Sequence, residues 1–126
     1  MSSSKDAALR DVTDVVESYL TAIHAGDTRR LAEIFEPGAS LIGWDEGELR
    51  RVPLPKWFAF VDSIPSPASA GVPFDGKIVS IDVSETVAVA KVSESYRAFK
   101  YVDYLSLVND GGQWKIVGKS YHQFAA

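Results

Sequence analysis

Apolar residues in the first part of the chain recur every three or four positions, a spacing typical of amphipathic helices. Gly26 suits the end of a helix spanning residues 6–25, and Asp27 can cap a second, shorter helix. Pro55 fits the first turn of a third helix. The expected apolar positions are Leu9, Val12, Val16, Tyr19, Leu20 and Ile23 in the first helix, Leu31, Ile34 and Phe35 in the second, and Trp57, Phe58, Phe60, Val61 and Ile64 in the third.

The remaining segments carry strand signals. Residues 39–44 and 48–52 are predicted to form a hairpin through Asp45-Glu46-Gly47. From Lys77 onward, turn signals near residues 84–85, 98–99 and 110–111 separate four strands in meander order. Helices first and strands after predict an α+β fold, with a strongly curved, mainly antiparallel sheet around about three helices and an internal pocket. We expect residues 1–126 to form a single domain.

Composition narrows the function classes. The chain has 126 residues and a formal net charge of −4, and no basic stripe favours nucleic acid as a partner. It contains no cysteine, which excludes disulfides and thiolate chemistry. No apolar stretch approaches the length of a bilayer span and no signal-peptide pattern occurs, so we expect a cytoplasmic location and no membrane partner. Two histidines without ligand spacing, and no phosphate or dinucleotide motif, predict neither a metal site nor a cofactor.

Strand register predicts where the pocket lies. A two-residue turn at Asp110-Gly111 would place Asp103 opposite Gly118 and Tyr101 opposite Ser120. Symmetric closure of the preceding turn would pair Glu94 with Asp103. Because side chains alternate between faces, both hairpins predict one inner face that is apolar at one end and polar at the other. The residues expected to line this polar end are Glu94, Tyr96, Tyr101, Asp103, Ser120 and His122.

Two carboxylates opposed on a half-buried face do not both ionise cheaply, so one of Glu94 and Asp103 is expected to hold a proton at neutral pH. Such a pair can donate or accept a proton in catalysis. In the alternative structural interpretation, Glu94 leans out at the sheet margin and Asp103 bonds Tyr101 or Tyr19. Trp44 and Trp57 are likewise either an aromatic wall for a flat ligand or ordinary core.

Three segments carry a resemblance to a known superfamily: residues 19–27 (YLTAIHAGD), 101–107 (YVDYLSL) and 112–117 (GQWKIV). The chain resembles the nuclear-transport-factor-2-like (NTF2-like) superfamily over nearly its whole length. It is most similar to the putative lumazine-binding and SnoaL-like groups and more distantly similar to ketosteroid isomerase. The resemblance implies a cystatin-like α+β cone and a homodimer packed through the outer sheet face.

The resemblance also implies roles for particular residues. Tyr19 and Asp103 match the oxyanion-hole tyrosine and aspartate of ketosteroid isomerase, in which an apolar site keeps the acid protonated. The general base of that enzyme does not carry over, because Gly43 stands where the base would be and Asp45 follows two residues later.

Three hypotheses follow. The first is a protein that binds a small apolar or aromatic molecule in its pocket. The second is a cofactor-independent acid–base enzyme, such as an isomerase, dehydratase or cyclase, in which Asp103 or Glu94 moves a proton and Tyr19 stabilises an oxyanion. The third is a non-catalytic dimerisation or partner-binding module whose pocket is filled by its own aromatic side chains.

Overall fold

The structure is a computed structural model that describes residues 2–125. Three helices, α1 (Ser2–Ala25), α2 (Thr28–Ile34) and α3 (Leu54–Ser63), accompany six strands. The strands are β1 (Phe35–Asp45), β2 (Glu48–Pro53), β3 (Lys77–Ser84), β4 (Val87–Tyr96), β5 (Phe99–Asp110) and β6 (Gln113–Phe124). All three predicted helices and the predicted hairpin are present. Within residues 2–125, none of the helices combines the length and apolar character needed to cross a membrane.

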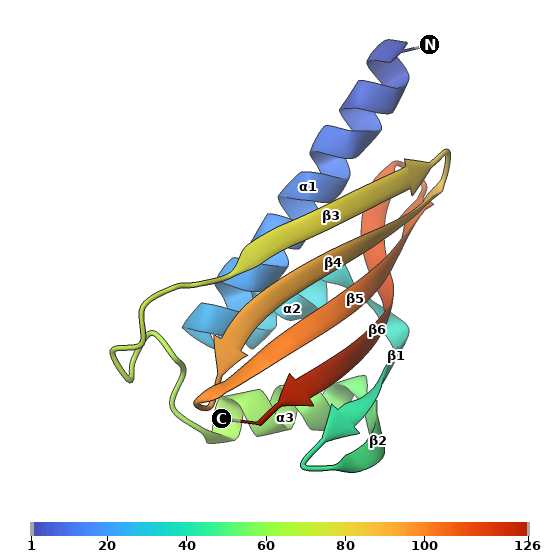
Figure 1. Cartoon of the computed structure of the whole chain (residues 1–126). Helices are drawn as coiled ribbons and strands as arrows, with labels where there is room; N and C mark the ends of the chain where they lie inside the picture. Colours follow the sequence, from blue (N-terminus) through green and yellow to red (C-terminus); the bar gives the residue numbers. More distant parts are fainter. Residues whose placement is uncertain (1, 126) are drawn as a thin grey trace.

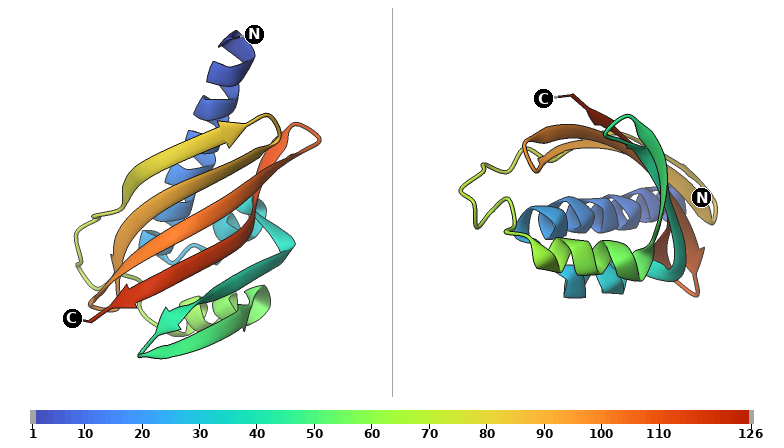
Figure 2. Two further views of the ribbon diagram at one scale, coloured as in Figure 1. Left: turned by 45° about the vertical axis from the view of Figure 1, so that its right-hand side comes forward. Right: turned by 90° about the horizontal axis from the view of Figure 1, so that it is seen from below.

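The strands form one sheet in the order β2-β1-β6-β5-β4-β3. Every neighbouring pair is antiparallel except β1 and β6, which run parallel. The last four strands follow each other as the predicted meander (Figure 1). Seen from below, the strands curve over α1 and α3, so that the helices fill the concave face (Figure 2). The predicted α+β fold is confirmed.

Local signals explain how the chain passes from α1 through α2 into β1. Gly26 has a φ of +67°, a left-handed conformation that ends α1 at little cost. The side chain of Asp27 accepts a hydrogen bond of 3.0 Å from the backbone nitrogen of Arg30 and so caps α2. Phe35 begins β1 instead of ending α2, and it is almost fully buried. The prediction that Phe35 belongs to the second helix was therefore wrong.

The core lies between the concave sheet face and the helices. Its members alternate along each strand and recur every three to four residues along α1, as the apolar pattern predicts. They include Val12, Val16, Tyr19, Leu31, Phe35, Leu41, Ala90, Val92, Leu105, Leu107 and Ile116.

Both predicted hairpin registers differ from those observed. Between β4 and β5 the turn is the two-residue Arg97-Ala98, with φ values of +53° and +67°, and it places Glu94 opposite Tyr101. Asp103 lies opposite Val92, so Glu94 and Asp103 are diagonal neighbours on one face and not a directly opposed pair. Between β5 and β6 the turn is Gly111-Gly112, because both positions need a positive φ and glycine adopts it without strain.

A β-bulge in β6 changes which side chains of that strand face inward. Leu107 pairs with Ile116, whereas Ser106, which directly precedes Leu107, pairs with Gly118. Val117 is therefore an extra residue without a partner on β5. Beyond the bulge, Asp103 lies opposite Tyr121 and not opposite Gly118. One extra residue reverses the inward and outward positions in the second half of β6.

Candidate functional site

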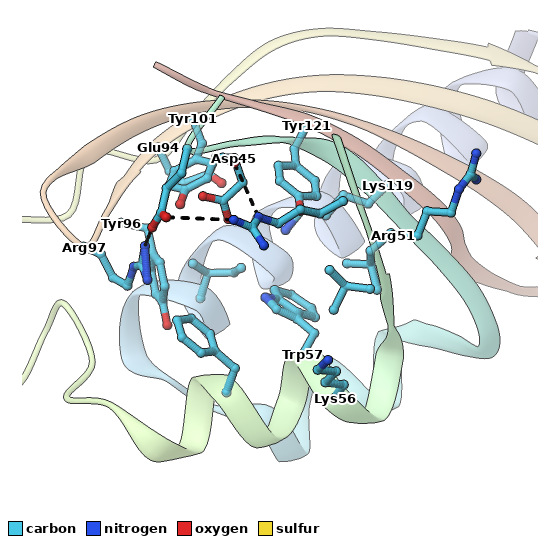
Figure 3. A pocket seen from close by; sticks show the side chains of 16 residues that line it. Asp45, Arg51, Lys56, Trp57, Glu94, Tyr96, Arg97, Tyr101, Lys119 and Tyr121 are labelled. Atoms are coloured by element: carbon cyan, nitrogen blue, oxygen red, sulfur yellow. Dashed lines mark hydrogen bonds and ion pairs between the residues drawn. The ribbon is translucent and has the colours of Figure 1, made fainter. Parts of the chain in front are cut away.

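A cavity of about 600 Å³ lies between the concave sheet face and α3. Its apolar side is built by Ile23 of α1, Leu41 of β1, Val52 of β2 and Trp57 and Phe60 of α3. The polar side comes mainly from β4, β5 and β6. Figure 3 shows Glu94, Tyr96 and Tyr101 on one side of the cavity and Lys119 and Tyr121 on the other, with Trp57 facing them from α3.

Tyr19 and Asp103 form the buried layer under this cavity, and neither has any solvent exposure. The Tyr19 hydroxyl donates a hydrogen bond of 2.5 Å to Asp103 Oδ2. Burial, followed by the negative charge of Asp103 and of Glu94, raises the pKa of Tyr19 well above its usual value. Tyr19 therefore keeps its proton and serves as a donor to Asp103.

Glu94 is 6% exposed and reaches the cavity from β4. Burial raises its pKa to about 10, reinforced by the negative charge of Asp103 and by the ability of that carboxylate to accept a hydrogen bond from the protonated acid. The positive charge of Lys119 acts in the opposite direction. Glu94 is thus a neutral acid at pH 7.

The proton of Glu94 accounts for two buried oxygens. Glu94 Oε2 and Asp103 Oδ1 accept no hydrogen bond from any donor within residues 2–125. Buried polar atoms are normally paired, and a proton carried by Glu94 and donated to Asp103 pairs both oxygens at once. Tyr19 donates to Asp103 Oδ2, and Oδ1 stays available to accept the proton of Glu94.

Lys119 brings a positive charge next to the Tyr19–Asp103 pair, in addition to the other cations that line the cavity. Its side chain is 8% exposed, and Nζ lies 3.9 Å from Asp103 Oδ2, which is an ion pair without a hydrogen bond. The ammonium lies 4.2 Å from the centre of a Trp57 ring and at 5.3 and 5.5 Å from the rings of Tyr19 and Tyr121. These cation–π contacts hold the charge beside the cavity.

Residues of the two hairpin tips lie at the opening. Glu46 contacts both Arg50 and Arg97, each at 3.9 Å, and Arg50 also contacts Glu48 at 3.1 Å. These are exposed pairs, so they contribute little to stability. Deeper in the same region, Asp45 Oδ1 and the Tyr96 hydroxyl are buried without a hydrogen-bond partner among the described residues.

Tyr121 explains why no side chain occupies position 43. A Cβ atom on Gly43 would lie 2.5 Å from Cγ of the Tyr121 ring, closer than any real contact. Pairing between β1 and β2 continues to Asp45 opposite Glu48, which places Asp45 on the cavity side two residues further along. As for metals, the described residues contain no cluster of three or more histidine or acidic side chains that could bind one.

The model of the family described as putative lumazine-binding matches residues 7–122. The chain belongs to this putative lumazine-binding family. Solved structures agree: an NTF2-like protein of unknown function from Silicibacter pomeroyi has a TM-score of 0.84 at 26% identity, over 95% of this chain and 98% of the other. A similar protein from Shewanella baltica has a TM-score of 0.84 at 23% identity, over 95% and 96% of the two chains. The predicted NTF2-like superfamily is confirmed.

One curated relative of this family member has a named activity. Aldolase FrzH from Cladobotryum sp is 24% identical over 106 residues, which cover 84% of this chain and 83% of the relative. The aldolase activity in this name is that of the relative.

Six of the residues predicted for the site lie together. Glu94, Tyr96, Tyr101 and Trp57 line the cavity, and Tyr19 and Asp103 lie directly beneath it. The alternative in which Asp103 bonds Tyr19 describes the observed contact, although Glu94 points inward and not out at the sheet margin.

Three predicted residues lie elsewhere. Ser120, His122 and Trp44 are exposed on the outer sheet face, where Trp44 neighbours His122 across the parallel β1–β6 pair. Their predicted place in the pocket was wrong. For Ser120 and His122 the reason is the bulge at Val117, and for Trp44 it is the alternation of β1, which turns Gly43 and Asp45 inward.

The same bulge brings in residues that the sequence prediction missed, chiefly Lys119 and Tyr121. A signal was present in the sequence. Ile116 and Val117 are consecutive apolar residues followed by Gly118, which breaks strict alternation and is typical of a bulge.

Proposed function

We propose that this family member binds a small, partly aromatic molecule in the cavity between α3 and the concave sheet face. The observation that carries the proposal is an open cavity of about 600 Å³ that combines an apolar wall with buried polar atoms left without partners. This combination is typical of ligand pockets. It argues against the third hypothesis, in which the protein's own aromatic residues fill the pocket.

The experiment measures thermal unfolding in the presence of small aromatic compounds, beginning with lumazine, for which the family is named. A ligand present at about 100 times its Kd stabilises the native state by about 2.7 kcal/mol, enough to raise Tm by several degrees. Val52→Trp places a large side chain at the cavity wall and should abolish the shift. Val79→Trp, on exposed β3, is the matched control and should preserve it. A shift that survives Val52→Trp would locate binding elsewhere, and no shift with any compound would contradict the proposal.

A second candidate function is a cofactor-independent acid–base enzyme, favoured by the neutral acid Glu94 at the cavity wall. In such an enzyme a base takes the α-proton of the substrate while an acid gives its proton to the carbonyl oxygen, and the product is an enol. Asp45, which lines the cavity and has a buried oxygen without a partner among the described residues, is placed to act as the base, and Glu94 supplies the acid proton. The aldolase relative supports this candidate, because aldol chemistry proceeds through an enol or enolate.

Proton exchange tests this candidate without requiring the natural substrate. A ketone ligand identified by thermal shift is incubated with the protein in D₂O, and loss of the α-proton signal is followed by NMR. Glu94→Gln keeps the size of the side chain and removes the acid, so exchange should fall by about 100-fold or more. Equal exchange with the wild type and Glu94→Gln would contradict a catalytic role for Glu94.

The homodimer through the outer sheet face stays a prediction. Val87, Val89 and Tyr104 are each more than 40% exposed on this face, and their apolar area is compatible with a second copy. Sedimentation velocity of the wild type and of Tyr104→Glu tests it. A wild-type monomer at micromolar concentration would rule the dimer out. Cytoplasmic location, and the absence of nucleic-acid and membrane partners, likewise stay predictions.

A further inference from the structure

Lys119 has three N–H donors at the cavity wall, and none of them is used within the protein. Its ammonium donates no hydrogen bond to any of the residues 2–125, and its nearest charged atom, Asp103 Oδ2, lies 3.9 Å away. The side chain is 8% exposed and lines the open cavity, so its donors face the space that solvent or a ligand occupies. Its position on the cavity wall allows a ligand to provide an acceptor.

Asp103 does not provide it, because Oδ2, the oxygen nearest to the ammonium, lies 3.9 Å from Nζ. This oxygen already accepts a hydrogen bond of 2.5 Å from Tyr19. Asp103 lies below the cavity with no exposure, whereas Lys119 is part of the wall. The carboxylate therefore balances the charge of Lys119 without using its donors.

This arrangement differs from the one that the resemblance to ketosteroid isomerase implies. There Tyr19 and Asp103 would both donate to the oxygen of the ligand. In this protein the Tyr19 hydroxyl donates its hydrogen bond to Asp103, and both side chains are fully buried. Among the residues that line the cavity, Lys119 carries an unused cation beside flat aromatic walls, which Trp57 provides at 4.2 Å and Tyr121 at 5.5 Å.

We propose that Lys119 selects the ligand of this pocket by donating hydrogen bonds to a carbonyl, enolate or carboxylate oxygen of a flat molecule that lies against Trp57. The inference rests on the proposed function and specifies its ligand class. It assigns Lys119, and not the Tyr19–Asp103 pair, as the group that holds the oxygen. Charge-assisted hydrogen bonds of this kind are shorter and stronger than neutral ones.

A matched pair of fluorescent probes tests this assignment. 1-Anilinonaphthalene-8-sulfonate carries an oxyanion, and N-phenyl-1-naphthylamine has the same aromatic skeleton without it. Their dissociation constants are measured by fluorescence titration for the wild type, Lys119→Met, Lys119→Arg and the control Lys77→Met, which removes an exposed cation on β3.

The expected result is a selective loss. Lys119→Met should weaken the sulfonate probe by about tenfold or more and change the neutral probe by less than about threefold. Lys119→Arg, which keeps the charge, should recover part of the lost affinity. Lys77→Met should affect neither probe.

Other outcomes would overturn the inference. Equal weakening of both probes by Lys119→Met would assign Lys119 a packing role, and unchanged affinity for the sulfonate would remove it from recognition. If the neutral probe binds but Val52→Trp does not displace it, the proposed function fails instead. Should Lys119→Met not fold, intermolecular NOEs between the sulfonate probe and the Lys119 side chain in the wild type decide the question, and their absence refutes the contact.

Discussion

Replacing Glu94 by Gln should remove most of the pH dependence of stability between about pH 6 and pH 8. In the folded protein the pKa of Glu94 is raised to about 10 from its ordinary value of 4.5. Between these values the native state holds one proton more than the unfolded state. The free energy of unfolding therefore falls as pH rises, by about 1.4 kcal/mol per pH unit.

The magnitude follows from that single proton. Across the two units from pH 6 to pH 8, the wild type should lose about 2.7 kcal/mol that the variant does not lose. Gln does not titrate, and its amide can still donate a hydrogen bond to Asp103. Asp75, whose pKa is lowered to about 2 by hydrogen bonds from Lys100 and Ser95 that outweigh its desolvation, affects stability only at acid pH and in the opposite sense.

The assay is urea unfolding followed by tryptophan fluorescence at pH 6, 7 and 8. Glu17→Gln, an exposed substitution on α1, is the matched control and should run parallel to the wild type. If Glu94→Gln also ran parallel to the wild type, Glu94 would be ionised in the native state. The proton shared with Asp103 would then be refuted.

Three further predictions concern other parts of the structure, and urea unfolding tests each of them. Tyr19→Phe removes the donor to Asp103 Oδ2 and should cost about 1.5–3 kcal/mol, and a cost below about 0.5 kcal/mol would contradict the hydrogen bond. Leu105→Ala, at a fully buried position, should lower the free energy of unfolding by about 2–5 kcal/mol, whereas Val89→Ala on the exposed face should lower it much less. Similar losses for the two variants would contradict the position of the core. Ala98→Gly should stabilise by about 1 kcal/mol, because Ala98 has a φ of +67°, and a loss of stability would argue against that turn.

The helices and the core were predictable because their signal is a repeating one. Tyr19 belongs to a row of apolar residues spaced by three and four, and the structure buries it completely. The inward positions of Glu94 and Asp103 were also predictable, even though both hairpin turns were misplaced. The observed register between β4 and β5 differs from the predicted one by two residues, and a shift of two keeps every side chain on its face.

The part of the site that β6 contributes could not be predicted from alternation along the strand. The bulge at Val117 adds one residue to β6, and a shift of one exchanges the faces of every residue that follows. Alternation therefore predicted Ser120 where Lys119 lies and His122 where Tyr121 lies. The partners across the opening, such as Glu46 and Arg97, come from turns far apart in the chain, and only the folded arrangement brings them together.

The bulge at Val117 also bears on how pockets of this kind diversify. Deleting Val117 would leave Lys119 opposite Leu105 and Tyr121 opposite Asp103, so the lining of the cavity would stay the same. If Val117 instead paired regularly with Ser106, every later residue of β6 would change face, turning Ser120 and His122 inward and Lys119 and Tyr121 outward. Substitutions that favour regular pairing at this one point would thus give evolution, or a protein engineer, a hydroxyl and imidazole wall in place of a cationic, aromatic one on the same scaffold.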